Sequence, residues 1–287
     1  MNIPKWCAQG VPRLADVIVN YFSDLLCTSN THTAPIIANI PTTVTEAQNV
    51  SLLAPVSYEE VCKALFQMHP DKSTGLDGMT PVKNPSSMTD LKPISLCNVL
   101  YKIISKVLAN HLKEVLPQLI STNQSTFVHG RLITDNIMIS YEVMHYLKRK
   151  SRGKEGFMTL SLDFSEAYDR VEWQFLKDMM CKMSFSHHWI NLILSCVSSV
   201  RYKVLSSGRE MGPIIPTRGI RQGDPLSSYP FLICAEGFSA LIKQFESIGH
   251  LRGCKVANGA PIISHMLFVD DSYVYCRANE REASNVI

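Results

Sequence analysis

Several features that define common protein classes are missing from this chain of 287 residues. Its nine cysteines, scattered from Cys7 to Cys276, form no Cys-x-x-Cys pair, so neither a zinc knuckle nor a disulfide framework is expected. A secretory signal and an apolar run long enough to span a membrane are also missing. So are the Gly-x-Ser-x-Gly and phosphate-loop patterns, which disfavours serine hydrolases and P-loop enzymes. We therefore expect a soluble protein without a membrane partner, in the nucleus or the cytoplasm.

A strong excess of one charge is absent as well. The formal net charge of +3 permits a nucleic-acid partner without requiring one. A basic run at 148–154 follows a predicted helix, and it is either a solvated helix end or a phosphate contact. The apolar fraction of 46% is enough for a large core, so we expect one large domain or two closely joined subdomains.

Hydrophobic periodicity and capping residues predict most of the secondary structure. Ser57 and Glu60 have the spacing of a capping box, and residues 157–163 alternate like a half-buried strand that ends at Asp163. Residues 29–55, rich in Pro, Thr, Ser and Asn, are expected to be irregular. Helices are expected near 14–26, 58–68, 98–117, 135–150, 172–179, 187–198 and 227–245, and a further strand near 201–205. The sum is an α+β fold, with helices covering one face of a small antiparallel sheet.

Two adjacent aspartates, Asp270 and Asp271, stand between the apolar runs 266–269 and 273–276. This arrangement predicts a strand, a tight turn and a second strand, with both carboxylates at the tip. Neighbouring carboxylates repel each other unless a cation lies between them, so the pair indicates a divalent metal, although Asp is also a common turn residue. If the strand that ends at Asp163 lies beside this hairpin, three carboxylates can hold two Mg²⁺ ions for phosphoryl transfer.

The runs 163–169, 219–226 and 268–271, in this order, resemble the palm motifs of a reverse transcriptase. More narrowly, the runs 91–98 and 167–173 resemble plant LINE-type retrotransposon polymerases, which lack long terminal repeats. The resemblance implies a right-hand polymerase palm, a small antiparallel sheet backed by helices, and partial fingers. It implies RNA-directed DNA polymerase activity on an RNA template and a DNA primer, with deoxynucleoside triphosphates and Mg²⁺, for which Mn²⁺ could substitute.

The resemblance also implies roles for individual residues. Asp163 and Asp270 match the principal metal ligands of the family, and Asp271 matches its third carboxylate. Tyr168 matches an aromatic residue beneath the incoming sugar, where a ring would favour deoxynucleotides; the alternative is core packing. Gln222 and Gly223 match the motif against the incoming nucleotide, and the alternative is a turn that needs glycine for its backbone, which we favour for Gly219.

Three basic residues match family positions in the fingers. Lys92 stands where relatives have an arginine that faces the triphosphate, so the charge is kept without the bidentate fork. Lys72 matches a fingers position and Arg131 one near the template, and for both a solvated or ion-paired side chain is an equal alternative.

Two further features are interpreted as structural rather than catalytic. Asp169 and Glu172 have capping-box-like spacing, so Asp169 is interpreted as a helix cap. His187 and His188 have no cysteine or carboxylate at metal spacing, and a structural or surface role is expected for both.

The resemblance divides the chain into an N-terminal helix with a connecting segment (1–56), partial fingers (57–156) and a palm with the catalytic motifs (157–287). Relatives carry additional fingers residues between 78 and 81, and a thumb after the catalytic hairpin, and both are missing from this sequence. Two hypotheses follow. The chain is an RNA-directed DNA polymerase domain, or it is a truncated, catalytically inactive retrotransposon remnant that at most binds nucleic acid. Neither requires an obligate protein partner.

Overall fold

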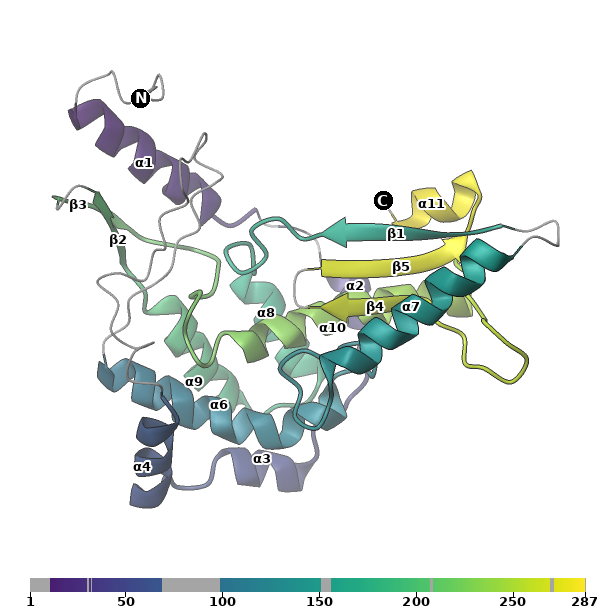
Figure 1. Ribbon diagram of the computed structural model, residues 1–287. Coiled ribbons are helices and arrows are strands. Elements are labelled where there is room, and N and C mark those ends of the chain that lie inside the picture. Colours follow the sequence, from purple (N-terminus) through teal and green to yellow (C-terminus); the bar gives the residue numbers. More distant parts are fainter. Residues whose placement is uncertain are drawn as a thin grey trace.

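Helices and two small antiparallel sheets make up the chain. The computed structural model describes residues 11–29, 31, 33–68, 99–150, 156–206, 209–268 and 271–286 (Figure 1). The helices are α1 (Val11–Leu25), α2 (Ala34–Ala38), α3 (Glu46–Leu52), α4 (Tyr58–Gln67), α6 (Val99–Leu119), α7 (Ile133–Arg149), α8 (Trp173–Lys182), α9 (His187–Ser198), α10 (Ser228–Ser247) and α11 (Glu280–Val286). The strands are β1 (Phe157–Asp163), β2 (Tyr202–Ser206), β3 (Arg209–Ile214), β4 (His265–Phe268) and β5 (Asp271–Arg277).

The larger sheet has the strand order β1-β5-β4, and both pairs are antiparallel. Strands β4 and β5 pair as the predicted antiparallel hairpin. Asp271, predicted at its tip, is instead the first residue of β5, and residues 269 and 270 lie outside the described residues. Strand β1 lies on the other side of β5, so the strand that ends at Asp163 is indeed adjacent to the hairpin.

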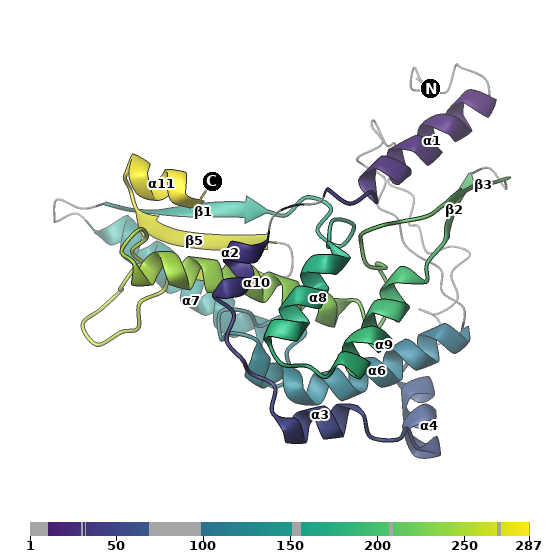
Figure 2. The ribbon, with the colours of Figure 1, turned by 180° about the vertical axis from the view of Figure 1, so that it is seen from behind.

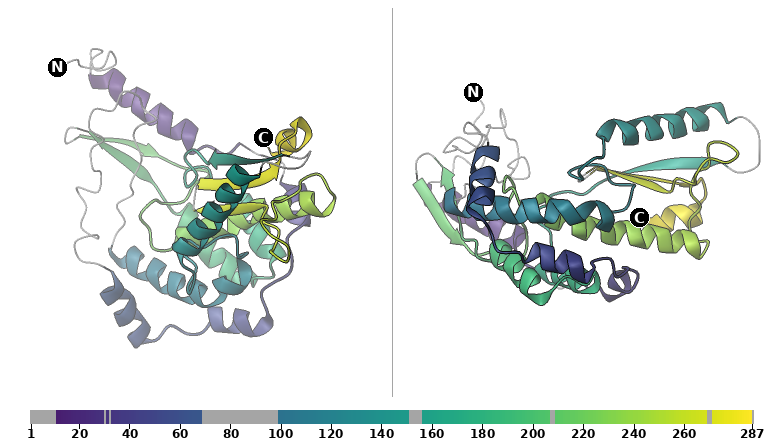
Figure 3. Two further views of the ribbon diagram at one scale, coloured as in Figure 1. Left: turned by 45° about the vertical axis from the view of Figure 1, so that its right-hand side comes forward. Right: turned by 90° about the horizontal axis from the view of Figure 1, so that it is seen from below.

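Helices lie on both faces of this sheet, so the expectation of a single covered face was wrong. Helix α10 covers one face, where Ile242 belongs to a buried cluster with Val274. Helix α7 lies on the other, where Val143 is buried with Tyr275 (Figure 3). The reason is that β5, the central strand, has apolar or aromatic side chains on both of its faces, and both must be removed from water.

The main core lies beside the sheet, where α3, α6, α8, α9 and α10 pack together. Its centre includes Leu112 of α6, Leu176 of α8 and Trp189 of α9, all almost fully buried. Gly237 lets α10 approach its neighbours, because a Cβ there would lie 2.9 Å from the Phe175 ring. Helix α6 runs through Pro117 to Leu119, two residues beyond the predicted end.

Helix α1 packs on the separate β2–β3 hairpin, away from the larger sheet (Figure 2). Ile18 and Phe22 of α1 are buried against Ile214 of β3. The strand expected near 201–205 is confirmed as β2, whereas its partner β3 and the final helix α11 were not predicted.

Two local predictions were wrong. The segment 29–55 contains α2 and α3, and α3 begins with a capping box in which Thr45 and Gln48 bond reciprocally. Asp169 does not cap a helix, because α8 begins at Trp173 with Glu172 as its N-cap residue. The capping box of Ser57 in α4 is confirmed. None of the helices in the described ranges is long and apolar enough to cross a bilayer.

Candidate active site

Asp163 and Asp271 face each other at one end of the larger sheet. They are register partners in the antiparallel β1–β5 pair, and both are exposed. The Cα atoms of such partners lie about 4.5–5.5 Å apart and their side chains project from the same face. Neither carboxylate has a hydrogen-bond or ion-pair partner among the described residues. Asp270, predicted as a principal ligand, lies outside those residues, as does Val269.

This pair fits a divalent cation by its chemistry. Two unpaired, solvent-facing carboxylates at this separation repel each other, and Mg²⁺ accepts a few carboxylate oxygens while it keeps water and substrate phosphates as its other ligands. In the described part of the chain no group of three His, Cys, Asp or Glu side chains lies close enough to hold a metal. A third carboxylate would have to come from Asp270.

The chain leaves β1 through a turn that is fixed on α10. Phe164 stacks edge-on against Phe238 of α10, with ring centroids 5.6 Å apart. Glu166 then adopts a left-handed conformation at φ 55° and accepts hydrogen bonds from Tyr21 and Arg170. These contacts fix the path of the chain directly after Asp163.

Tyr168 lies beside the loop that contains Gln222. Its ring is half-buried and stacks on Phe231 of α10, with centroids 4.9 Å apart and planes 7° apart. Its carbonyl oxygen accepts a hydrogen bond of 2.9 Å from the Ile220 amide. The alternative of core packing therefore describes part of what Tyr168 does, since its ring packs on α10 beside the Gln222 loop.

Gly219 begins that loop, and its conformation explains the glycine. The residue has φ +92°, and a Cβ would lie 2.8 Å from the carbonyl oxygen of Asp169. Its amide donates to the Val171 carbonyl, and its own carbonyl accepts from the indole of Trp173 at 2.7 Å. The backbone requirement expected for Gly219 is thereby confirmed.

Gln222 and Gly223 form the outer part of the loop. Gly223 is exposed and left-handed at φ +91°. The amide side chain of Gln222 is half-exposed and has no hydrogen-bond partner within the described ranges. The loop thus presents a free donor and acceptor, and a glycine backbone that a ligand can approach.

Asp169 is a partly buried carboxylate behind this loop. Burial, with a smaller contribution from the neighbouring Glu166, raises its pKa to about 6, and Arg170 opposes the shift. Its carboxyl group therefore takes up a proton at a higher pH than an exposed aspartate does.

Arg131 has a structural position that the sequence did not indicate. Its guanidinium donates to the carbonyl oxygens of Pro117, Ile120, Ser121 and Gln124, where α6 ends. Both terminal nitrogens are occupied in closing the end of the helix, and no ion pair to Arg131 occurs among the described residues.

The remaining basic candidates give less information. Lys72 and Lys92 lie outside the described residues. In the basic run, the Lys150 ammonium lies 4.4 Å from the centroid of the Phe157 ring, which supports a helix-end role for that residue. His187 and His188 are exposed at the start of α9, as expected.

A buried polar cluster supports β4 from behind. The imidazole of His265 bonds to the hydroxyl groups of Ser264 and Ser239, and burial lowers its pKa to about 3, so it is neutral. Asn123 donates to the His265 carbonyl at 2.6 Å and accepts from the Leu267 amide at 2.9 Å. Sequence reasoning missed this cluster, and isolated polar residues in the sequence gave no sign of it.

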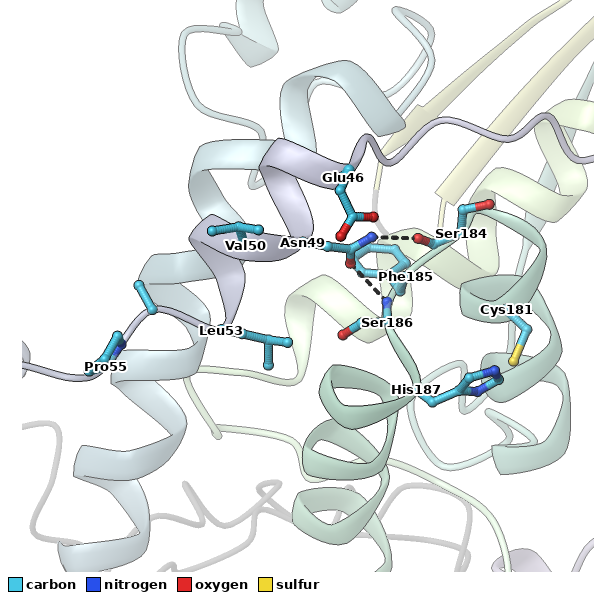
Figure 4. Close-up of a pocket in the computed structure, with 11 residues that line it drawn as sticks. Glu46, Asn49, Val50, Leu53, Pro55, Cys181, Ser184, Phe185, Ser186 and His187 are labelled. Carbon is cyan, nitrogen blue, oxygen red and sulfur yellow. Dashed lines mark hydrogen bonds between the residues drawn. The ribbon is translucent and has the colours of Figure 1, made fainter.

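A cavity of about 740 Å³ lies elsewhere, between α3 and the turn that joins α8 to α9 (Figure 4). Asn49 of α3 lines the cavity and joins its two sides, since its side chain donates to the Ser184 carbonyl and accepts from the Ser186 amide. Glu46 is the single carboxylate among its lining residues. The cavity therefore cannot provide the paired carboxylates found at the end of the sheet.

Several known proteins have sequences similar to this chain. Residues 82–287 match the family model described as reverse transcriptase (RNA-dependent DNA polymerase). The "Transposon TX1 uncharacterized 149 kDa protein" of Xenopus laevis is 27% identical over 242 residues, which cover 70% of this chain and 18% of that protein. The "Retrovirus-related Pol polyprotein from type-1 retrotransposable element R2" of Nasonia vitripennis is 27% identical over 235 residues, 78% of this chain and 21% of that protein.

A third similarity is shorter and closer. An uncharacterized mitochondrial protein of Arabidopsis thaliana is 46% identical over 66 residues, which cover 23% of this chain and 54% of that protein. The chain spans about a fifth of the length of the two longer relatives.

Proposed function

Since the chain belongs to the reverse transcriptase family of RNA-dependent DNA polymerases, we propose that it forms the palm and part of the fingers of an active polymerase domain from a LINE-type retrotransposon. The similarity to retrotransposon proteins supports an element without long terminal repeats. The Arabidopsis similarity supports a plant source. The proposed substrates are an RNA template, a DNA primer and deoxynucleoside triphosphates.

The observation that carries the proposal is the unpaired Asp163 directly across the sheet from Asp271. With Asp270, these residues would hold two Mg²⁺ ions, or Mn²⁺ in their place. When bound, the ions lower the pKa of the primer 3′-hydroxyl and neutralise the charge on the triphosphate. The proposed site lies at the end of the sheet where β1 and β5 pair with each other.

Residues outside the carboxylate pair would position the nucleotide. The ring of Tyr168, held by Phe231, provides a wall beneath the sugar that disfavours a 2′-hydroxyl. Gln222 and Gly223 would contact the incoming nucleotide with a free amide and an open backbone, and Lys92 would contact the triphosphate. Arg131 is left out of this set, because its guanidinium is already used in closing α6.

The proposed domains are 1–56, 57–156 and 157–287. The start of β1 at Phe157 supports the last boundary. Helix α6, from the fingers segment, shares one buried cluster with α8, α9 and α10 of the palm. The partial fingers are therefore continuous with the palm rather than a separately packed unit.

Primer extension tests the proposal directly. Purified protein is expected to extend a DNA primer on an RNA template with Mg²⁺ and deoxynucleotides, and Asp163→Asn, Asp270→Asn and Asp271→Asn are each expected to abolish the extension. Asp16→Asn, an exposed carboxylate on α1, is the matched control. Incorporation no higher than that of Asp270→Asn would contradict the proposal and favour an inactive remnant that at most binds nucleic acid.

A further inference from the structure

Asp224 is a buried carboxylate at the base of the Gln222 loop, and the sequence analysis assigned it no role. Its side chain is 6% exposed. The Tyr101 hydroxyl lies 2.7 Å from Oδ2, and the hydroxyl of Ser105 donates to Oδ1. Oδ1 also accepts from the Leu226 amide at 3.1 Å. Asp224 therefore joins the loop to α6, a helix more than a hundred residues earlier in the chain.

A second contact between the same helix and the same loop lies beside the first. The guanidinium carbon of Arg221 lies 4.0 Å from the centroid of the Tyr101 ring. Tyr101 thus holds the loop with its hydroxyl and with its ring face. Burial, together with the charge of Asp224, raises the pKa of the Tyr101 hydroxyl, so Tyr101 keeps its proton and remains a donor.

The opposite end of the loop is fixed independently. The amides of Gly219 and Ile220 donate to the carbonyls of Val171 and Tyr168. Gln222 and Gly223 stand between these two attachments and have no side-chain anchor of their own within the described ranges. Their position is consequently set by the attachments on either side, one on the turn after β1 and one on α6.

We propose that Asp224, held by Tyr101 and Ser105, is a positioning residue that fixes Gln222 and Gly223 for the incoming nucleotide. This inference rests on the proposed function, because it assigns the nucleotide to the Gln222 loop. It makes α6 a determinant of nucleotide affinity although α6 lies outside the palm motifs.

Steady-state primer extension with one deoxynucleotide tests this role. Tyr101→Phe removes a single hydroxyl and keeps the ring beneath Arg221, so the fold is expected to be retained. KM for the deoxynucleotide is expected to rise about tenfold, the factor for one lost hydrogen bond to a charged group, while kcat stays within about twofold. Asp224→Ala is expected to raise KM further than Asp224→Asn, which keeps one acceptor oxygen.

The control is Tyr141→Phe, since Tyr141 is an exposed tyrosine on α7 that should leave KM unchanged. A fall in kcat with an unchanged KM in Tyr101→Phe would overturn the inference, because it would indicate general damage to the fold. An unchanged KM and kcat would overturn it as well.

Amide hydrogen exchange separates this inference from the proposed function. In the unliganded protein, Tyr101→Phe is expected to speed exchange at residues 221–223 and to leave β1 and β5 unchanged. A uniform change, or none, would overturn the positioning role. Failure of the wild-type protein to extend a primer would contradict the proposed function alone, and the exchange result would still decide the inference.

Discussion

Glu172, at the start of α8, joins three segments of the chain. Its Oε2 accepts from the Thr28 hydroxyl at 2.6 Å. Its Oε1 accepts from the amide and the hydroxyl of Ser29, at 3.0 and 2.9 Å, and from Arg218 at 3.1 Å. Residues just after α1, the start of α8 and the segment just before Gly219 are therefore connected through one carboxylate.

The contacts of Glu172 determine how much stability the protein should lose when this carboxylate is removed. The side chains of Arg218 and Glu172 are 11% and 15% exposed, so solvent screens their ion pair only in part. A hydrogen bond to a charged group contributes about 1.5–3 kcal/mol, and part of this is kept by a neutral amide. We expect Glu172→Gln to lower the free energy of unfolding by about 2 kcal/mol near neutral pH, and Glu172→Ala by about 3 kcal/mol.

The pH dependence follows from the direction of the pKa shift. Burial alone would raise the pKa of Glu172, but hydrogen bonds from the Ser29 amide, from Thr28 and from the Ser29 hydroxyl, together with Arg218, hold it below its usual range. A carboxyl group with a lowered folded-state pKa contributes stability that is fully present above its unfolded pKa and is lost as the pH falls through the folded value. The difference between wild type and Glu172→Gln should therefore shrink below about pH 4.5.

Urea denaturation followed by tryptophan fluorescence measures both effects, at about pH 7.5 and at acidic pH values down to about 3.5. Glu114→Gln, on the exposed face of α6, is the control and should change stability little at either pH. Equal losses for Glu172→Gln at neutral and acidic pH would refute the electrostatic reasoning. No loss at neutral pH would refute the structural assignment of the cluster.

Two further substitutions test the surroundings of the loop. Gly219→Ala should destabilise the fold by about 2–3 kcal/mol in urea denaturation. The control is Gly249→Ala, at a glycine with φ +73° and no atom within 4 Å of the added Cβ. It should show only the cost of a left-handed backbone for alanine, about 1 kcal/mol. Equal losses would show that the approach of Asp169 to Gly219 has no effect. Asp169→Asn should stabilise the protein by about 2 kcal/mol near neutral pH, because a carboxyl group with a raised pKa destabilises the folded state where it is ionised. Thermal melts should show that this gain in stability disappears as the pH falls from about 6 to 4. A gain that does not depend on pH would contradict this prediction.

Local signals in the sequence were sufficient where an element depends on its own residues. The capping box at Ser57 and the apolar stripe of α6 predicted their helices because caps and periodicity act over a few positions. Helix α3 was not predicted, because residues 29–55 are rich in Pro, Thr, Ser and Asn, which are typical of irregular chain, although Thr45 and Gln48 form a capping box. For Asp169 the prediction of a helix cap was wrong. Its spacing to Glu172 fits a capping box, but the chain is still in a turn at Asp169, and α8 begins only at Trp173.

Features that depend on remote segments were not predictable in the same way. The apolar side chains on both faces of β5 require that both be covered, but nothing in β5 indicates that α7 covers the second face. Likewise, nothing near Arg131 indicates that four carbonyl oxygens converge on its guanidinium. Both arise from how distant elements meet. The position of Asp163 beside the hairpin is also a contact between remote segments, but it was predicted. Strands of one small sheet can be arranged in only a few ways, and the family resemblance favoured the arrangement in which these strands are adjacent.

The same distinction applies to the proposed chemistry. Asp163 and Asp271 belong to recognisable motifs, but their neighbours are held by groups outside those motifs. The Gln222 loop depends on Tyr101, and β4 depends on the backbone and side chain of Asn123. If the proposed positioning role is correct, a substitution in α6 or in the segment that follows it should lower nucleotide affinity even when every motif residue is kept. Under the proposed function, the carboxylates are necessary for activity, and we expect these polar contacts to determine whether the nucleotide is correctly placed beside them.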